Sequence, residues 1–279
     1  MTRIAFVQCE VIDADVERNF AVLELTLSAI RDDTDIVVFP ELFLQGFLTN
    51  EEVTELALAP DSDIFRKIID LSRINAVVIA FGFAERRDDE FYNALAWISP
   101  DGVVEIYRKN YLWLCDKDIY SPGNNNKVVD HQNLKFGLAI CFDIEFPESG
   151  RAVAQQGSEV LIVSNGNMHP YGAVHRIAAQ ARAVENHCYV VMCNRTGHSR
   201  GRTFVGDSLV VTPHGDIVCE LGTEPGIGYV EIDASVIAKS KSAYNYLECL
   251  NGLPVPSRPM NDHSGGVLSD CEACAGDEQ

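Results

Sequence analysis

The sequence predicts an α/β protein in which helices cover mixed β-sheets. Short, continuous apolar runs such as Ile36-Val-Val-Phe-Pro40 are typical of strands buried on both faces. Segments with apolar residues at helical spacing, such as 15–31, alternate with these runs. Hairpin signals at Pro100-Asp-Gly102 and Pro213-His-Gly215 interrupt the alternation, so a purely parallel sheet is not expected.

The expected elements follow from these patterns in chain order. In the first helix, Val16, Phe20 and Leu23 mark the apolar face. Residues 110–134 are loop-like, and the regular pattern fades from about residue 240. The strands are expected at 3–9, 36–40, 76–82, 92–99, 103–107, 135–140, 160–163, 189–193, 207–212, 216–221 and 228–232. The helices are expected at 15–31, 61–74, 147–156 and 173–186.

Composition and charge indicate an ordinary globular protein. Of its 279 residues, 47% are apolar and 23% are charged. The net charge of −19 repels phosphate backbones, which argues against nucleic acid as a partner. No apolar run reaches the roughly 18 residues of a membrane span, and the N-terminal residues lack the features of a signal peptide. We therefore expect a cytoplasmic protein without a membrane partner.

A single domain is expected over residues 1–240, because no linker or repeat interrupts the pattern. Residues 241–279 are expected to form a C-terminal extension that ends in a flexible acidic tail. Cys271 and Cys274 form a C-x-x-C in this tail, but one such pair supplies too few ligands for a zinc site. None of the seven histidines pairs at a metal-ligand spacing. We therefore expect neither a metal nor an organic cofactor.

Three polar residues follow strongly apolar strands: Glu41, Lys109 and Cys141. Taken singly, each has an ordinary explanation, as a neighbour of a helix start, a solvated turn residue or a packed thiol. Together they form a chemical set at strand ends, where α/β proteins build their sites. A carboxylate takes a proton from a thiol, an ammonium favours the thiolate, and the thiolate attacks an amide carbonyl. The Lys109 ammonium and the backbone N–H of Phe142 are then the expected donors to the oxyanion.

These residues lie in motifs that resemble those of the nitrilase superfamily, the carbon–nitrogen hydrolases. The three motifs occur in the order and at the spacing of that family, and the likeness extends over about residues 3–235. They are Phe39-Pro-Glu41, Tyr107-Arg-Lys109 and Cys141-Phe-Asp-Ile-Glu-Phe-Pro-Glu148. Further landmarks resemble the family at 181–186, 194–197 and 206–215.

The resemblance implies a four-layer αββα sandwich with a Glu-Lys-Cys triad. Glu41 is then the general base, Lys109 the oxyanion stabiliser and Cys141 the nucleophile. It also implies a homodimer or higher homo-oligomer, with the first part of 241–279 as an oligomer contact. Asp116 aligns with a second glutamate of the family and is a candidate auxiliary acid, although its side chain is one methylene shorter. The family's usual Lys-x-His-Leu is here Lys109-Asn-Tyr111-Leu112, which is expected to alter the pocket wall.

The resemblance also indicates a substrate class. Cys-aromatic-Asp followed by Phe-Pro-Glu is similar to the amidase and carbamoylase branches, which favours a small linear amide over a nitrile. Glu145 and the stretch Asn167-Met-His-Pro-Tyr171 are similar to amidases that act on δ-aminovaleramide and related amino amides. Glu145 and Asn167 are therefore candidate substrate-binding residues. In the alternative interpretation, Glu145 pairs with a neighbouring arginine and does not contact substrate.

Three other functions remain open. One is hydrolysis of an N-carbamoyl amine such as N-carbamoylputrescine, which releases CO2 together with ammonia. The second is a nitrilase, and the third is a non-catalytic member that keeps the fold as a binding subunit. The intact set of Glu41, Lys109 and Cys141 argues against the third function.

Overall fold

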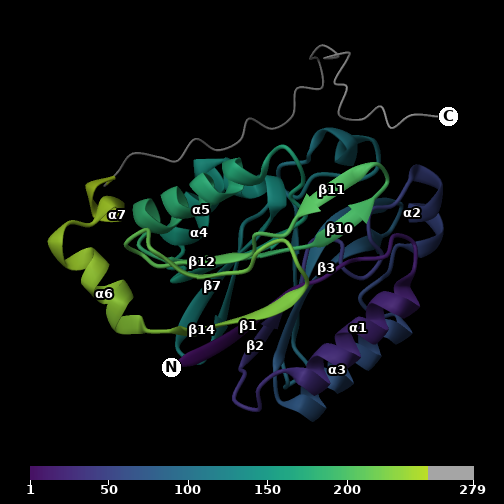
Figure 1. Ribbon diagram of the computed structural model, residues 1–279, viewed down its shortest axis with the longest axis horizontal. Helices are drawn as coiled ribbons and strands as arrows, with labels where there is room; N and C mark the ends of the chain where they lie inside the picture. Colours follow the sequence, from purple (N-terminus) through teal and green to yellow (C-terminus); the bar gives the residue numbers. More distant parts are fainter. Residues whose placement is uncertain (251–279) are drawn as a thin grey trace.

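The computed structural model describes residues 1–250, which form a four-layer αββα sandwich (Figure 1). Two six-stranded sheets pack face to face in the middle. Helices α1 (Val16–Ala29) and α3 (Asp63–Asn75) cover the outer face of the first sheet. Helices α4 (Pro147–Gln155) and α5 (Gly172–Asn186) cover the outer face of the second. The architecture expected from the family resemblance is confirmed.

The first sheet has the strand order β14-β1-β2-β3-β4-β5. Strands β1, β2 and β3 are parallel, with Ile36 of β2 between Ile4 and Val78. The other neighbours are antiparallel, so the sheet is mixed, as the hairpin signals predict. Its strands are β1 (Thr2–Gln8), β2 (Ile36–Val38), β3 (Val78–Arg87), β4 (Glu90–Ile98), β5 (Val104–Arg108) and β14 (Gly226–Ile232).

The second sheet has the order β13-β12-β9-β8-β7-β6 and is also mixed. Strands β7, β8 and β9 are parallel, and the outer neighbours are antiparallel. Its strands are β6 (Lys127–His131), β7 (Leu134–Ile140), β8 (Val160–Asn165), β9 (Tyr189–Asn194), β12 (Leu209–Val211) and β13 (Ile217–Glu220). A separate hairpin consists of β10 (Thr196–Ser199) and β11 (Arg202–Val205).

Large aromatic side chains fill the space between the sheets. Trp97 of the first sheet meets Phe136 of the second, with ring centroids 5.2 Å apart. Beneath α3, Phe65 packs edge-on against Phe83 at 4.9 Å. Fully burying one such side chain stabilises a protein by about 1.5–3 kcal/mol. The contact between Trp97 and Phe136 therefore helps to fix how the two sheets sit on each other, whereas the contact between Phe65 and Phe83 holds α3 on the outer face of the first sheet.

The segment 110–134, expected as a loop, contains two short elements. The 3₁₀ helix η1 (Leu114–Asp118) lies near its start, and β6 lies near its end. Strand β6 is an edge strand whose neighbour in the sheet is β7. Its five residues alternate too briefly to separate a strand from a loop by pattern alone.

Other elements also differ from the expectation. Helix α2 (Asn50–Leu56) buries little apolar surface but is held by a capping box between Thr49 and Glu52. Hairpin β10–β11 lacks an apolar run, and the strand expected from Asp207 begins at Leu209. Regular structure continues into α6 and α7, where the pattern was expected to fade. Those helices are α6 (Ala234–Ala243) and α7 (Tyr246–Cys249).

Within residues 1–250, every helix is too short or too polar to cross a lipid bilayer. In the same range, no group of three or more His, Cys, Asp or Glu side chains is arranged to hold a metal ion. The expected acidic tail, with Cys271 and Cys274, lies outside the described residues.

Candidate active site

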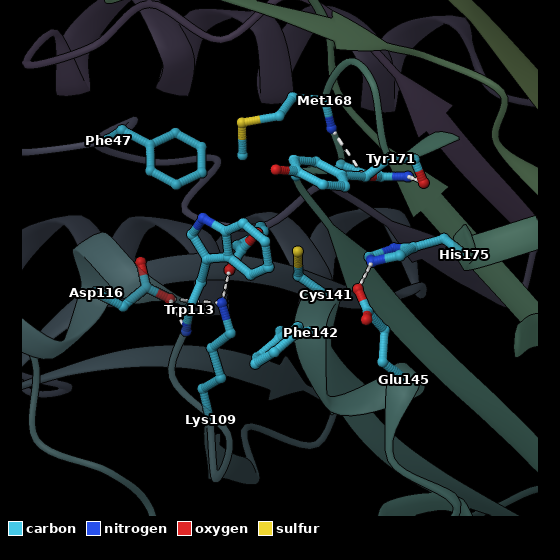
Figure 2. Close-up of a pocket in the computed structure, with 13 residues that line it drawn as sticks. Phe47, Lys109, Trp113, Asp116, Cys141, Phe142, Glu145, Met168, Tyr171 and His175 are labelled. Carbon is cyan, nitrogen blue, oxygen red and sulfur yellow. Dashed lines mark hydrogen bonds and ion pairs between the residues drawn. The ribbon is translucent and has the colours of Figure 1, made fainter. Parts of the chain in front are cut away.

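Glu41, Lys109 and Cys141 line one pocket, although they come from different sheets. Figure 2 shows Lys109 and Cys141 in this pocket. Glu41 follows β2 and Lys109 follows β5, both in the first sheet. Cys141 follows β7 in the second sheet. As the sequence predicts, the fold brings these three strand ends to a shared opening.

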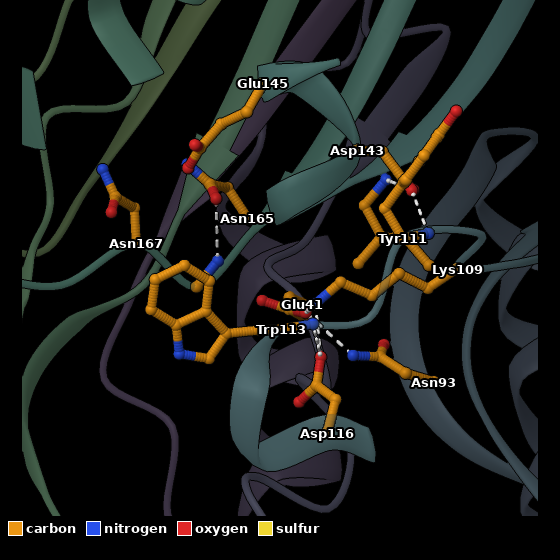
Figure 3. A network of polar contacts seen from close by, with 12 residues as sticks. Glu41, Asn93, Lys109, Tyr111, Trp113, Asp116, Asp143, Glu145, Asn165 and Asn167 are labelled. Atoms are coloured by element: carbon orange, nitrogen blue, oxygen red, sulfur yellow. Dashed lines mark hydrogen bonds and ion pairs between the residues drawn. The ribbon is translucent and has the colours of Figure 1, made fainter. Parts of the chain in front are cut away.

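Lys109 is buried between two carboxylates (Figure 3). Its Nζ lies 2.6 Å from Glu41 Oε1 and 2.6 Å from Asp116 Oδ2. Burial alone would lower the pKa of Lys109, but the Asp116 and Glu41 carboxylates outweigh it and raise that pKa well above its ordinary value. The lysine therefore stays an ammonium, and two carboxylates with one ammonium leave this cluster with a net negative charge.

Glu41 is held by one carboxylate oxygen, whereas the other has no hydrogen-bond partner among the described residues. Oε1 accepts from Asn93 Nδ2 at 2.8 Å as well as from Lys109. The Glu41 N–H donates to the Asn165 carbonyl of the second sheet at 3.2 Å. Oε2 is buried and has no hydrogen-bond partner among residues 1–250. A Cβ placed on Gly166 would lie only 2.5 Å from Oε2, so this oxygen is packed against the Gly166 backbone.

Cys141 occupies a turn that directs its sulfur into the pocket (Figure 2). It starts the 3₁₀ helix η2 (Cys141–Glu145) with a φ of 44°, in the left-handed region that non-glycine residues rarely adopt. Buried Asp143 ties this turn to its surroundings, because its carboxylate accepts from Ile140 N at 2.9 Å and from Tyr107 Oη at 2.7 Å. Burial raises the pKa of Asp143 to about 6, although these donors oppose the shift.

The thiol of Cys141 is protonated in this environment. Burial is the largest cause that raises its pKa well above the ordinary value, and the Glu41 carboxylate adds to the shift. The Lys109 ammonium and the Gly166 N–H act in the opposite direction. The thiol therefore requires a proton acceptor when it reacts, and Glu41 is the carboxylate that faces it.

Asp116 reaches Lys109 despite its shorter side chain, because η1 carries it to the pocket wall. Its Oδ2 also accepts from Trp113 N at 3.3 Å. Tyr111, expected to change the pocket wall, instead stacks on Phe146 with ring centroids 4.0 Å apart. Trp113 supplies the wall and meets Tyr171 edge-on at 5.3 Å.

The candidate substrate-binding residues all line the pocket, with different surroundings. Glu145 pairs with a histidine rather than an arginine: its Oε1 lies 3.0 Å from His175 Nε2. Arg182 donates to the Glu145 carbonyl oxygen instead. Asn167 uses its side chain within its own loop, donating to the Tyr171 carbonyl at 3.2 Å and accepting from the next N–H. Phe142 places its ring edge-on to the pocket wall, 4.9 Å from Trp113.

Several residues in and behind the pocket were not predicted from the sequence. Asn93 interrupts an apolar strand, and this polar position in β4 is the signal that could have revealed it. His175 lies on the buried face of α5, seven residues before the buried Arg182. Polar residues at helical spacing on a face otherwise made of alanine could have indicated a site there. Phe47 completes the apolar wall together with Met168, and no sequence pattern distinguished Phe47.

Comparison with known proteins agrees with this geometry. The family model described as carbon-nitrogen hydrolase matches residues 3–242. An (R)-stereoselective amidase of Pseudomonas sp. is 38% identical, covering 88% of this chain and 90% of that protein. A nitrilase of Pyrococcus abyssi is 34% identical, covering 86% and 93%. The solved structure of an amidase from Nesterenkonia sp. superposes with a TM-score of 0.79 at 25% identity, covering 88% and 92%.

Proposed function

Because the chain belongs to the carbon–nitrogen hydrolase family, we propose that it is a cysteine-dependent amidohydrolase. It cleaves the non-peptide C–N bond of a small linear amide and yields a carboxylic acid and ammonia. The observation that carries this proposal is the buried Lys109 ammonium, held by Glu41 and Asp116 in the pocket that contains the Cys141 thiol.

In the first step, Cys141 attacks the amide carbonyl while Glu41 Oε2 takes the thiol proton. This assignment is supported by the raised pKa of Cys141, caused by burial and then by Glu41, and by the unoccupied Glu41 oxygen. The carbonyl oxygen becomes an oxyanion. The proposed donors to it are Lys109 Nζ and the Phe142 N–H, which is supported by the presence of both residues in the pocket lining. Each such donor is worth about 3–4 kcal/mol of barrier.

The intermediate then collapses to a thioester as its C–N bond breaks. Protonated Glu41 returns its proton to the leaving nitrogen, so ammonia departs as a neutral molecule. Water next attacks the thioester while Glu41 accepts a proton from it. As the C–S bond breaks, the acid is released and Glu41 returns that proton to the Cys141 sulfur, which restores the thiol and the carboxylate. Asp116 keeps Lys109 charged and fixed throughout, which is supported by its 2.6 Å contact with Nζ.

The charge of the pocket favours a substrate that carries a cation away from the scissile bond. Glu41, Asp116 and Glu145 supply three carboxylates to the lining, whereas Lys109 supplies one ammonium. Even with His175 protonated, the lining remains net negative. An ω-amino amide fits this balance, with its ammonium on the Glu145 carboxylate, whose side chain is 25% exposed.

Turnover is tested by ammonia release over a panel of small amides, nitriles and N-carbamoyl amines. We expect ammonia from linear amides, and a thioester adduct on the wild-type protein that is absent in Cys141→Ala, detected by intact-mass spectrometry. The absence of turnover across the amide panel would overturn the proposal. Release of CO2 with ammonia would instead identify the carbamoyl-amine activity.

The cation preference has its own test. The kcat/KM for δ-aminovaleramide is expected to exceed that for valeramide, and Glu145→Gln should reduce this ratio about tenfold, since one charged contact is lost. Equal values in the wild type, or an unchanged ratio in the variant, would remove Glu145 from substrate recognition while leaving amide hydrolysis in place. The family resemblance also supports a homodimer or larger assembly, which light scattering measures directly.

A further inference from the structure

A chain of hydrogen bonds runs behind Cys141 and joins three elements. Glu145 Oε1 at the end of η2 lies 3.0 Å from His175 Nε2 on α5. The other ring nitrogen, His175 Nδ1, lies 3.1 Å from Asn165 Oδ1 at the end of β8. The same Asn165 oxygen accepts from the Gly166 N–H at 3.0 Å. His175 and Asn165 are both buried, so water competes little for these bonds.

These partners fix the orientation of the His175 ring. The Asn165 side-chain oxygen is an acceptor, and its bond from Gly166 N–H fixes which way the amide faces. Turning the amide over would place its NH2 against the Gly166 N–H, donor against donor. The ring thus lies between Asn165 Oδ1 on one nitrogen and a Glu145 carboxylate oxygen on the other, and it ties β8 to η2.

The chain of bonds ends at groups that contact the nucleophile. The Gly166 N–H stabilises the thiolate and lowers the pKa of Cys141 against the larger opposing effects of burial and Glu41. The Asn165 carbonyl accepts the Glu41 N–H at 3.2 Å. One residue thus holds both the backbone donor to the sulfur and the residue that supplies the facing carboxylate. A change in the orientation of Asn165 would therefore alter the position of both the Gly166 N–H and Glu41.

We propose that His175, paired with Glu145, is a positioning residue for Cys141. It holds Asn165, and through Asn165 both the Gly166 N–H and the Glu41 backbone, in place beside the reacting sulfur. Figure 2 shows the Cys141 thiol with the His175–Glu145 pair on one side and Lys109 on the other. The inference rests on the proposed role of Cys141 as nucleophile. The other ionisable side chains that line this pocket are Glu41, Lys109, Asp116 and Tyr171.

The test measures the reactivity of the thiol directly, without an amide substrate. The rate of Cys141 alkylation by iodoacetamide is followed against pH, with modification at this position read by peptide mass spectrometry. We expect His175→Phe, which keeps an aromatic ring but removes both bonds, to slow alkylation at pH 7–8 about tenfold. Its pH profile should move upward by about one unit, because tenfold in thiolate fraction corresponds to one pKa unit.

Two milder variants keep the test decisive if His175→Phe does not fold. His175→Asn retains a polar group near Asn165 without the ring, and Glu145→Gln retains a partner for Nε2 without the anion. Both should slow alkylation less than His175→Phe does. His198→Asn alters an exposed histidine of hairpin β10–β11 and should leave the profile unchanged. A folded His175→Phe protein with the wild-type profile would overturn the proposal, as would wild-type profiles in both milder variants.

The outcome is independent of whether amides are the substrates. If amide hydrolysis fails on every compound, the alkylation profiles still decide the role of His175. If hydrolysis succeeds but the profiles do not change, only the positioning role is lost. The substrate ratio in Glu145→Gln likewise separates substrate recognition from thiol reactivity.

Discussion

Replacing Gly166 by alanine tests how closely Glu41 must approach the reacting atoms. The added Cβ would lie 2.5 Å from Glu41 Oε2 and 3.1 Å from the ring of Phe47, whereas ordinary van der Waals contact begins at 3.4 Å. Oε2 therefore has to retreat by about 1 Å. Because Oε1 remains bonded to Asn93 and Lys109, the carboxylate must pivot about that oxygen.

The expected effect of this displacement is on the chemical step. A misplacement of about 1 Å at a catalytic group costs on the order of a hundredfold in rate, so kcat/KM of Gly166→Ala should fall by about that factor. The Gly166 backbone lies outside the positive-φ region, so alanine meets no backbone strain there. We therefore expect a small change in the unfolding free energy, and a fall carried by kcat rather than KM.

The assay is ammonia release at several concentrations of an amide substrate, with urea denaturation run in parallel. Gly222→Ala is the matched control, because a Cβ at that exposed glycine meets nothing within 4 Å. A Gly166→Ala enzyme with the kcat of the wild type would refute the reasoning. It would mean that Glu41 does not need its present position to move protons.

Three further predictions concern the surroundings of this cluster. Asp116→Asn removes a charged hydrogen bond to Lys109 worth about 1.5–3 kcal/mol, so kcat/KM should fall tenfold to a hundredfold in the ammonia assay, and Asp116→Glu should retain more activity. In the wild type, Arg108 holds the Glu85 carboxylate bidentately, and the Glu85 side chain is 1% exposed. Arg108→Ala leaves Glu85 as an unpaired buried charge and should lower the unfolding free energy, measured in urea, by about 3–5 kcal/mol. Burial raises the pKa of Asp143 to about 6, so its contribution to stability is full below its unfolded pKa near 3.8 and is lost as pH rises through 6. The difference in unfolding free energy between wild type and Asp143→Asn should therefore change between pH 4 and 6 and stay constant above pH 7.

The strand ends that carry the site could be predicted from local pattern. Glu41, Lys109 and Cys141 each interrupt or follow an apolar run, and such a break is visible in one dimension. The pairing of those strands into two sheets came from the family resemblance, because local pattern does not say which strands are neighbours. Elements without an apolar run, such as the hairpin β10–β11, were missed because no local pattern marks them.

The supporting contacts could not be predicted, because they depend on distances between segments far apart in the chain. Glu145 was expected to meet either a substrate cation or an arginine, and the structure pairs it with His175, thirty positions later. Asn93 reaches Glu41 across 52 positions. In both pairs, the contact is made only because the fold places two separate elements side by side: η2 and α5 for Glu145 and His175, and the end of β2 and β4 for Glu41 and Asn93.

The division of the site between the two sheets has a mechanical consequence. Glu41 and Lys109 travel with the first sheet, and Cys141 travels with the second. The distance from Cys141 to Glu41 and Lys109 therefore depends on how the two sheets are placed relative to each other. The aromatic layer around Trp97 and Phe136 helps to fix that placement. A large-to-small substitution in that layer, far from the substrate, would leave the catalytic residues of each sheet intact. It would nevertheless let the two sheets shift, so that Cys141 is no longer aligned with Glu41 and Lys109.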